Sequence, residues 1–144
     1  MKSPNRFEEY LNKGIVKRKS PEKPRAEFLF NEAKRSKLAL EKRLQKEKIE
    51  DLNSNSIIKD AYDIVMSFIR AKMLIKGYSA SGLFAHEAEV SYLRELGFKE
   101  NGVQFLNQLR YYRNGILYYG KILDKEYADK VIAFLNNVYP KLSQ

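Results

Sequence analysis

The chain has 144 residues, 44% of them hydrophobic and 31% charged, which is typical of one globular domain rather than a disordered segment. It has no cysteine and one histidine, His86, which excludes disulfides, thiolate metal centres and a multi-histidine metal site within one chain. No uncharged apolar run reaches the roughly 18 residues of a membrane span, and no signal peptide is recognisable. We therefore expect a cytoplasmic protein without a membrane partner.

The net charge of +9 is unevenly distributed. Residues 1–50 contain 15 Lys and Arg against 8 Asp and Glu, whereas residues 51–144 contain 12 against 10. A basic first third suits attraction to a polyanion such as RNA, because Lys and Arg contact phosphates independently of sequence. The solvated face of a lysine-rich protein would give the same composition, so charge alone identifies no ligand.

A short helix and a connector are predicted first. The helix spans about residues 5–13 and stops at Gly14. Its apolar face consists of Phe7, Tyr10 and Leu11. Residues 16–24 are basic and contain two prolines, which indicates a linker without regular structure.

A long surface helix is predicted next. Ser20 followed by Pro21 is a typical helix start, since the first turn needs no N–H from proline. The helix runs to about residue 50. Its packed stripe consists of Leu29, Ala33, Leu40 and Leu44. Residues 51–56 are rich in helix-capping side chains and indicate a turn.

Residues 57–75 are apolar almost all round, which predicts the central helix of a bundle. Residues 76–82 form a loop, and a helix over about 83–96 ends at Gly97. Its inward face consists of His86, Val90 and Leu93.

Two further helices complete the pattern, one over residues 100–119 and one over about 125–139. Asp124 is the expected cap of the last helix, and Pro140 its expected end. Its inward side chains are Val131, Phe134, Leu135 and Val138. No period-two alternation predicts a strand.

The expected fold is therefore an all-α antiparallel bundle of about five main helices plus a short N-terminal helix. The whole chain, 1–144, forms one domain. Residues 1–20 are its leading helix and basic connector, and residues 21–144 are the bundle.

The helix over residues 100–119 contains an arginine, Arg113, within its apolar stripe. The apolar residues of that stripe are Leu106, Leu109, Ile116 and Leu117. Arginine keeps its charge, so a carboxylate, a phosphate or a partner subunit must meet Arg113. Asn114 and Gly115 follow at once, and glycine inside a helix costs about 1 kcal/mol relative to alanine. Such local conflict is typical of a functional site.

This order of parts, with Arg113-Asn114 near the end of the penultimate helix, resembles the HEPN (higher-eukaryote and prokaryote nucleotide-binding) superfamily. Residues 5–20 resemble its leading helix and connector, 27–37 its first long helix, 61–78 its central helix and 109–114 its signature region. The resemblance covers nearly the whole chain. It implies a small helical bundle, commonly a homodimer whose two signature motifs face each other across a cleft.

Catalytic members of that superfamily are metal-independent ribonucleases in which histidine follows the motif arginine after four to six residues. Tyr118, Tyr119 and Gly120 occupy those positions here. A tyrosine with an ordinary pKa of about 10 is a poor base at neutral pH. The resemblance therefore implies a protein that binds RNA or a nucleotide and is non-catalytic or weakly catalytic, with no metal or cofactor.

The residues that this resemblance assigns to RNA or nucleotide binding are Arg110, Arg113, Asn114 and Tyr118. Arg113 and Tyr118 are the candidates within the motif for a catalytic role. Five positions on an ideal helix are separated by roughly 140°. The two side chains could therefore meet one ligand only if the helix distorts or ends near Asn114-Gly115, which Gly115 would permit.

Structural interpretations of the same residues remain open. Arg113 could form an ion pair with an acid such as Asp63 on the central helix. The tyrosines could stack on bases or pack against a second subunit. These tyrosines are Tyr111, Tyr112, Tyr118 and Tyr119. His86 is the only histidine that could replace the missing one, although in an apolar stripe it is more typical of a hydrogen-bonded core residue.

Two alternative functions follow from the resemblance. One is a metal-independent endoribonuclease of the toxin type. The other is a docking partner for a small nucleotidyltransferase in a toxin–antitoxin module.

Overall fold

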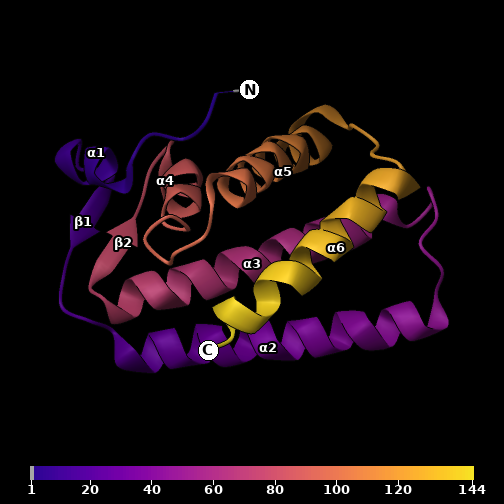
Figure 1. Cartoon of the computed structure of the whole chain (residues 1–144), viewed down its shortest axis with the longest axis horizontal. Helices are drawn as coiled ribbons and strands as arrows, with labels where there is room; N and C mark the ends of the chain where they lie inside the picture. Colours follow the sequence, from indigo (N-terminus) through magenta and orange to yellow (C-terminus); the bar gives the residue numbers. More distant parts are fainter. Residues whose placement is uncertain (1) are drawn as a thin grey trace.

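A computed structural model describes residues 2–144 and confirms the predicted helical bundle. Within those residues the chain has six helices and one small antiparallel sheet (Figure 1). The elements in chain order are α1 (Phe7–Asn12), β1 (Val16–Arg18), α2 (Lys23–Lys46), α3 (Ser54–Ile75), β2 (Tyr78–Ala80), α4 (Ala85–Ser91), α5 (Glu100–Tyr119) and α6 (Lys125–Leu142).

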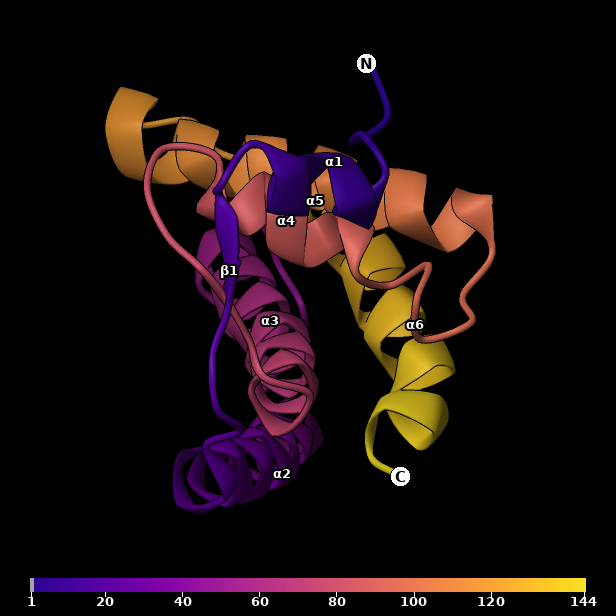
Figure 2. The same ribbon diagram turned by 90° about the vertical axis from the view of Figure 1, so that its left-hand side faces the viewer.

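The helices are arranged in three levels around α3. Figure 2 shows α2 beneath α3, α6 at the side, and α1, α4 and α5 crossing above. Helix α3 contacts α2, α6, α5 and α4, so it is the element that the others share. No helix described by the structure combines the length and apolar character needed to cross a bilayer.

The core is built on α3, as its continuous apolar sequence predicted. The Phe68 side chain is fully buried between α2 and α6. Its ring lies edge-on to Phe30, 5.4 Å away, and to Tyr139, 5.6 Å away. Aromatic pairs of this geometry add about 0.5–1.5 kcal/mol each beyond the area they bury.

Helix α2 begins later than the Ser20-Pro21 pair predicted. Its first residue is Lys23, and Pro24 occupies the first turn. The predicted stripe packs inward, with Ala33 and Leu40 buried. Lys37 is also buried, where its ammonium bonds to Glu41 and lies over an aromatic ring of α6. The late start arises because the residues before α2 are extended and bonded elsewhere.

The expectation of a structureless linker over residues 16–24 and of a loop over 76–82 was wrong in part. Strands β1 and β2 pair antiparallel, with Val16 opposite Ala80 and Arg18 opposite Tyr78. Lys19 and Ser81 extend the pairing through backbone bonds of 2.8 and 3.0 Å to Gly77 and Ile15. Three-residue strands are too short to show an alternating pattern, so nothing in the local sequence indicated them.

The helix predicted over 83–96 is shorter, because α4 ends at Ser91 and turns continue to Gly97. Bonds between residues three apart, such as Leu93 N–H to the Val90 carbonyl, tighten the chain after α4. Val90 and Leu93 are buried as expected, but the His86 side chain is 51% exposed. The prediction that His86 faces the core was wrong.

Helix α6 starts as predicted and ends later. The Asp124 carboxylate accepts a hydrogen bond from the Tyr127 N–H at 2.8 Å, which confirms the cap. Pro140 does not end the helix, which continues to Leu142. The carbonyl that lacks the N–H of residue 140 is that of Asn136, and both residues are exposed, so water can take the place of the missing donor.

Candidate functional site

Helix α5 carries the motif and runs without interruption through Gly115 to Tyr119. It ends at Gly120, whose φ of 64° closes the helix in the left-handed conformation. The distortion that could have brought Arg113 and Tyr118 together is therefore absent. In a regular helix the two side chains are roughly 140° apart, and Tyr118 is 74% exposed. One protomer does not bring them to one ligand.

Arg113 meets an intrachain carboxylate. Its Nη2 donates to Asp63 Oδ1 at 3.3 Å, and its Cζ lies 5.3 Å from the centre of the Tyr62 ring. Its Nε is buried without a hydrogen-bond partner among the described residues. The Asp63 side chain is 60% exposed, so the ion pair is open to solvent on the carboxylate side. The contact expected from the structural interpretation is present, but it satisfies only part of the guanidinium.

Arg110 lies one turn earlier on α5. Its Nε donates to Asn107 Oδ1 at 3.0 Å, and its Nη2 is 3.9 Å from Glu87 Oε1 on α4. Asn107 is buried and donates to the backbone carbonyl of Lys2. Asn114, the remaining predicted residue, is half-buried beside Arg113. The structure thus brings Arg110 and Arg113 to the side of α5 that faces α3 and α4.

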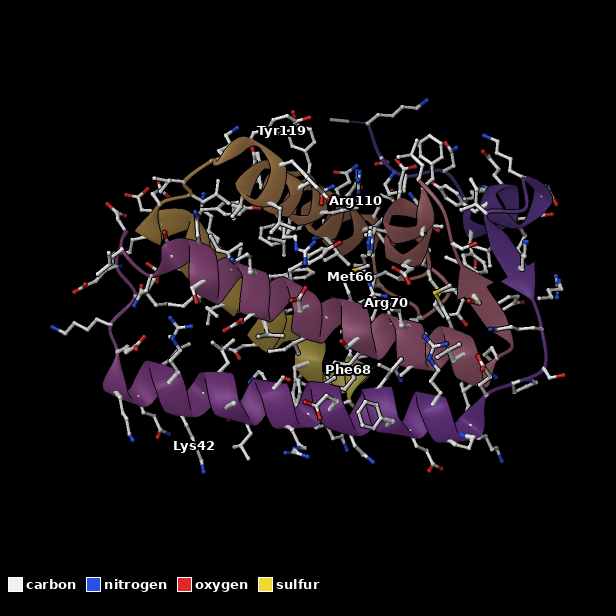
Figure 3. The ribbon with its side chains drawn as sticks, turned by 180° about the vertical axis from the view of Figure 1, so that it is seen from behind. Lys42, Met66, Phe68, Arg70, Arg110 and Tyr119 are labelled. Atoms are coloured by element: carbon white, nitrogen blue, oxygen red, sulfur yellow. The ribbon has the colours of Figure 1, made fainter. Side chains whose placement is uncertain are left out.

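The phenol of Tyr62 on α3 lies close enough to the charged groups around Arg113 for their charges to affect its pKa. Burial raises the pKa of Tyr62 to about 12, while the nearby guanidinium of Arg113 acts in the opposite direction. The charges of Glu89, Arg70 and Arg110 also act on this phenol. Tyr62 therefore keeps its proton at neutral pH and can donate a hydrogen bond but not act as a base. Figure 3 shows Arg70 of α3 and Arg110 of α5 on the same side of the molecule.

Each of the three arginines has a carboxylate neighbour, but the three contacts differ in quality. Arg70 Nε is 2.8 Å from Glu89 Oε2, whose side chain is only 7% exposed. The Arg110 and Arg113 contacts, at 3.9 and 3.3 Å, involve carboxylates that are 28% and 60% exposed. Solvent screens such contacts, and each contributes about 0–1 kcal/mol. A phosphate could therefore compete for Arg110 and Arg113 more readily than for Arg70.

The end of α5 exposes large apolar side chains, which we call the α5 patch. It consists of Tyr111, Leu117, Tyr118, Tyr119 and Ile122. Tyr118 and Tyr119 are 74% and 86% exposed, and Figure 3 shows Tyr119 at the far end of the helix. Single exposed apolar residues are common on protein surfaces, but several in one segment indicate a surface that binds a partner or a ligand.

A second polar cluster lies around His86 on α4. Its Nδ1 is 3.0 Å from Arg70 Nη2 and 3.2 Å from Glu89 Oε1. Neither Arg70 nor Glu89 was predicted from the sequence to be a site residue. Two features of the sequence could have indicated this cluster. His86 and Glu89 are three residues apart, as neighbours on one helix face are, and Arg70 is a charged residue within the largely apolar segment 57–75.

Among residues 2–144, no group of three or more His, Cys, Asp or Glu side chains is placed to bind a metal ion. No family model, curated protein or solved structure matches this chain. The HEPN resemblance therefore stays a prediction from the sequence.

Proposed function

We propose that this protein binds RNA or a nucleotide through α5, acts as a homodimer and has little or no catalytic activity. The observation that carries the proposal is the combination on one helix of two incompletely paired arginines, Arg110 and Arg113, with the exposed aromatic rings of the α5 patch. Guanidinium groups suit phosphates, and exposed aromatic rings suit unstacked bases.

The phosphate contacts belong to the side of α5 that faces α3. Arg113 has one ion pair, to the exposed Asp63, and Arg110 has one at 3.9 Å. Both guanidinium groups keep N–H donors beyond those bonds. A phosphate arriving from solvent would displace the exposed Asp63 carboxylate from Arg113 and accept hydrogen bonds from Arg113, as well as from Arg110 one turn away.

The homodimer uses the far end of the same helix. Leu117, Tyr119 and Ile122 are 46%, 86% and 76% exposed, and a second copy of this surface would cover them. Two copies meeting there would bring their arginines to the two sides of one cleft. Tyr118 would then line that cleft from the opposite protomer, which resolves its separation from Arg113 within one chain.

The absence of strong catalysis follows from the groups around Arg113. The motif positions that would carry histidine carry Tyr118 and Tyr119. Tyr62 has a pKa of about 12 and keeps its proton at neutral pH. General acid–base cleavage of RNA works best with a group whose pKa lies near the working pH, such as an imidazole.

The test measures the affinity of a short single-stranded RNA as a function of salt concentration. Arg113→Ala should weaken binding about tenfold and reduce the salt slope by about one. Lys130→Ala, an exposed change on α6, is the matched control and should have little effect. RNA recovered after incubation with chelator should be intact.

Asp63→Asn separates a binding role of Arg113 from a purely structural one. Removing this carboxylate frees the Arg113 guanidinium and should tighten RNA binding severalfold, since an electrostatic competitor is lost. If Arg113 serves only the fold, Asp63→Asn will leave the affinity unchanged. The absence of RNA and nucleotide binding by the wild-type protein would remove the proposal.

A further inference from the structure

A separate pocket of about 220 Å³ opens where α2, α3, β2 and α4 meet. Its polar lining consists of Arg25, Arg70, Ser79, His86 and Glu89. Arg70 lies on α3 beside α4 and β2 (Figure 3), away from the exposed end of α5. None of these residues belongs to the sequence motif that led to the proposed function.

The pocket contains one rigid guanidinium. Glu89 is 5% exposed and accepts from Arg70 Nε at 2.8 Å. This buried ion pair holds the Arg70 guanidinium in place, because breaking it would leave the Glu89 carboxylate buried without a partner. Arg70 Nη2 lies 3.0 Å from His86 Nδ1, which leaves Nη1 without a hydrogen bond to the described residues. Arg70 is therefore held in one orientation with N–H donors still free.

His86 presents its other ring nitrogen to the pocket side or to solvent. Its Nδ1 can accept from Arg70 or, when protonated, donate to Glu89, since both lie within 3.2 Å. In either arrangement Nε2 makes no hydrogen bond with the described residues. An imidazole fixed at one nitrogen and free at the other is a suitable ligand contact.

The pocket carries uncompensated positive charge. Glu89 balances Arg70, whereas Arg25 is only weakly paired. Its nearest partner, Glu22, is 4.0 Å away and lies closer to Lys19, at 3.1 Å. The Arg25 side chain is 63% exposed and lines the mouth. An anion entering the pocket would meet Arg25, Arg70 and His86 from three different helices.

We infer that this pocket binds a phosphomonoester, either the terminal phosphate of an RNA strand or that of a mononucleotide. A terminal phosphate has three free oxygens and close to two negative charges at neutral pH, and three donor groups surround the pocket. A phosphate inside a strand has only two free oxygens and must let the chain leave on both sides. Identifying the remainder of the ligand as RNA or nucleotide rests on the proposed function, but the phosphate site does not.

The pocket and the α5 arginines share one face of the molecule. The charges of Glu89 and Arg70 in the pocket and those of Arg110 and Arg113 on α5 all act on the Tyr62 phenol, so the two groups of charges are close together. An RNA whose body lies on α5 could therefore place its end in this pocket. The pocket would then select strands by their terminal phosphate.

His86 is the only histidine of the chain, so its imidazole NMR signals report directly on the pocket. Titration with AMP and with inorganic phosphate should shift these signals along a saturating curve, whereas adenosine should not shift them. Signals that respond to adenosine as strongly as to AMP, or that respond to neither AMP nor phosphate, would overturn the inference.

The decisive variant is Arg25→Ala, because Arg25 is exposed and its loss leaves the core intact. Its expected effect is about tenfold weaker AMP binding in the same titration. Arg35→Ala removes the same charge from an exposed position of α2 outside the pocket and should change the affinity less than twofold. Equal losses for both variants would show that only general charge attraction acts, which would contradict the inference.

RNA carrying either a 5′-phosphate or a 5′-hydroxyl group, together with 3′-phosphorylated RNA, tests the source of the phosphate. Preference for one phosphorylated end that disappears in Arg25→Ala supports an RNA end, and a shift with AMP alone supports a mononucleotide. RNA binding that depends on Arg113 but ignores both terminal phosphates, with no AMP response, would overturn the pocket and keep the proposed function. The reverse result would keep the pocket and remove that function.

Discussion

Helix α3 and the second half of α5 contrast sharply, although both are helical segments with several large apolar side chains. In α3 the side chains are buried in nearly every direction, from Ile57 to Leu74. In α5 burial ends at Leu109, and Leu117 and Tyr119 are exposed. The difference arises from neighbours, because α3 is surrounded by four helices whereas the end of α5 projects past them (Figure 2).

This contrast shows that an apolar helix face indicates a surface that tends to be buried, but it does not identify the element or partner that buries it. Within the chain, α2, α4, α5 and α6 cover α3. At the end of α5 the cover must come from outside the described residues, or the surface stays exposed to solvent. Four experiments test whether the two regions differ in stability and in association as their burial implies.

The largest expected effect is on the core. Phe68→Ala removes a fully buried ring from between Phe30 and Tyr139 and should lower the free energy of unfolding by about 3–5 kcal/mol. Leu117→Ala, at a side chain that is 46% exposed, should change it by only about 0.5 kcal/mol. Urea denaturation measures both, and comparable losses would contradict the contrast.

The next experiment uses pH at the contact between the two helices. The pKa of Tyr62 is about 12 in the folded protein and about 10 when unfolded. The unfolded state therefore loses this proton first, so Tyr62 makes stability fall between pH 10 and 12, with no such loss below pH 10. The contribution is about 1.4 kcal/mol per pH unit in that window.

Tyr62→Phe should remove that contribution, and thermal unfolding measured at several pH values from 8 to 11 would detect the difference. Wild type and Tyr62→Phe should lose stability in parallel up to about pH 10 and diverge above it. Identical pH profiles throughout would show that Tyr62 is less buried than its environment implies.

A smaller effect, of opposite sign, is expected in the second half of α5. Gly115 is helical, and an added Cβ would meet only the flexible Lys121 side chain, at 3.4 Å from its Cδ. Gly115→Ala should stabilise the protein by about 0.5–1 kcal/mol, because alanine favours the helix. Gly77→Ala is the contrasting control: at a φ of 82°, its Cβ would collide with the Lys19 carbonyl. A loss of stability in Gly115→Ala would mean that the end of α5 needs conformational freedom.

The smallest expected effect on stability is at the α5 patch, where association should change instead. Tyr119→Ser combined with Ile122→Ser replaces side chains that are 86% and 76% exposed, so the free energy of unfolding of the monomer should change by about 0.5 kcal/mol or less. Analytical ultracentrifugation should show a dimer for wild type and a monomer for the variant. The same mass for both would remove the patch as the dimer surface.

Much of the fold could be predicted because helices repeat their pattern over many residues. The centre of the bundle, the packed stripe of α2 and the Asp124 cap followed from local spacing and capping chemistry. The pairing of β1 with β2 could not be predicted, because Val16 and Ala80 are far apart in sequence and each strand is three residues long. The failed end at Pro140 shows that one missing N–H does not decide the end of a helix near its last turn.

The candidate site was predictable in type but not in geometry. The sequence predicted that Arg113 requires an anionic partner and offered Asp63 as one candidate, and the structure contains that ion pair. The sequence allowed the helix to end at Asn114-Gly115 or to continue, and spacing alone did not reveal that it ends at Gly120. The cluster of Arg70 and Glu89 depends on how α3 and α4 pack, and no periodic pattern encodes that packing.

The small sheet has a consequence for the order in which the chain folds. Helices α2 and α3 are neighbours in sequence and form the largest interface, so they can pair early. Strand β1 must wait for β2, and the carbonyls of Pro4 and Asn5 must wait for Arg94, which bonds to both. During synthesis the segment before α2 would thus be fixed later than α2 and α3, although it emerges before them, and would stay open to proteases until most of the bundle exists.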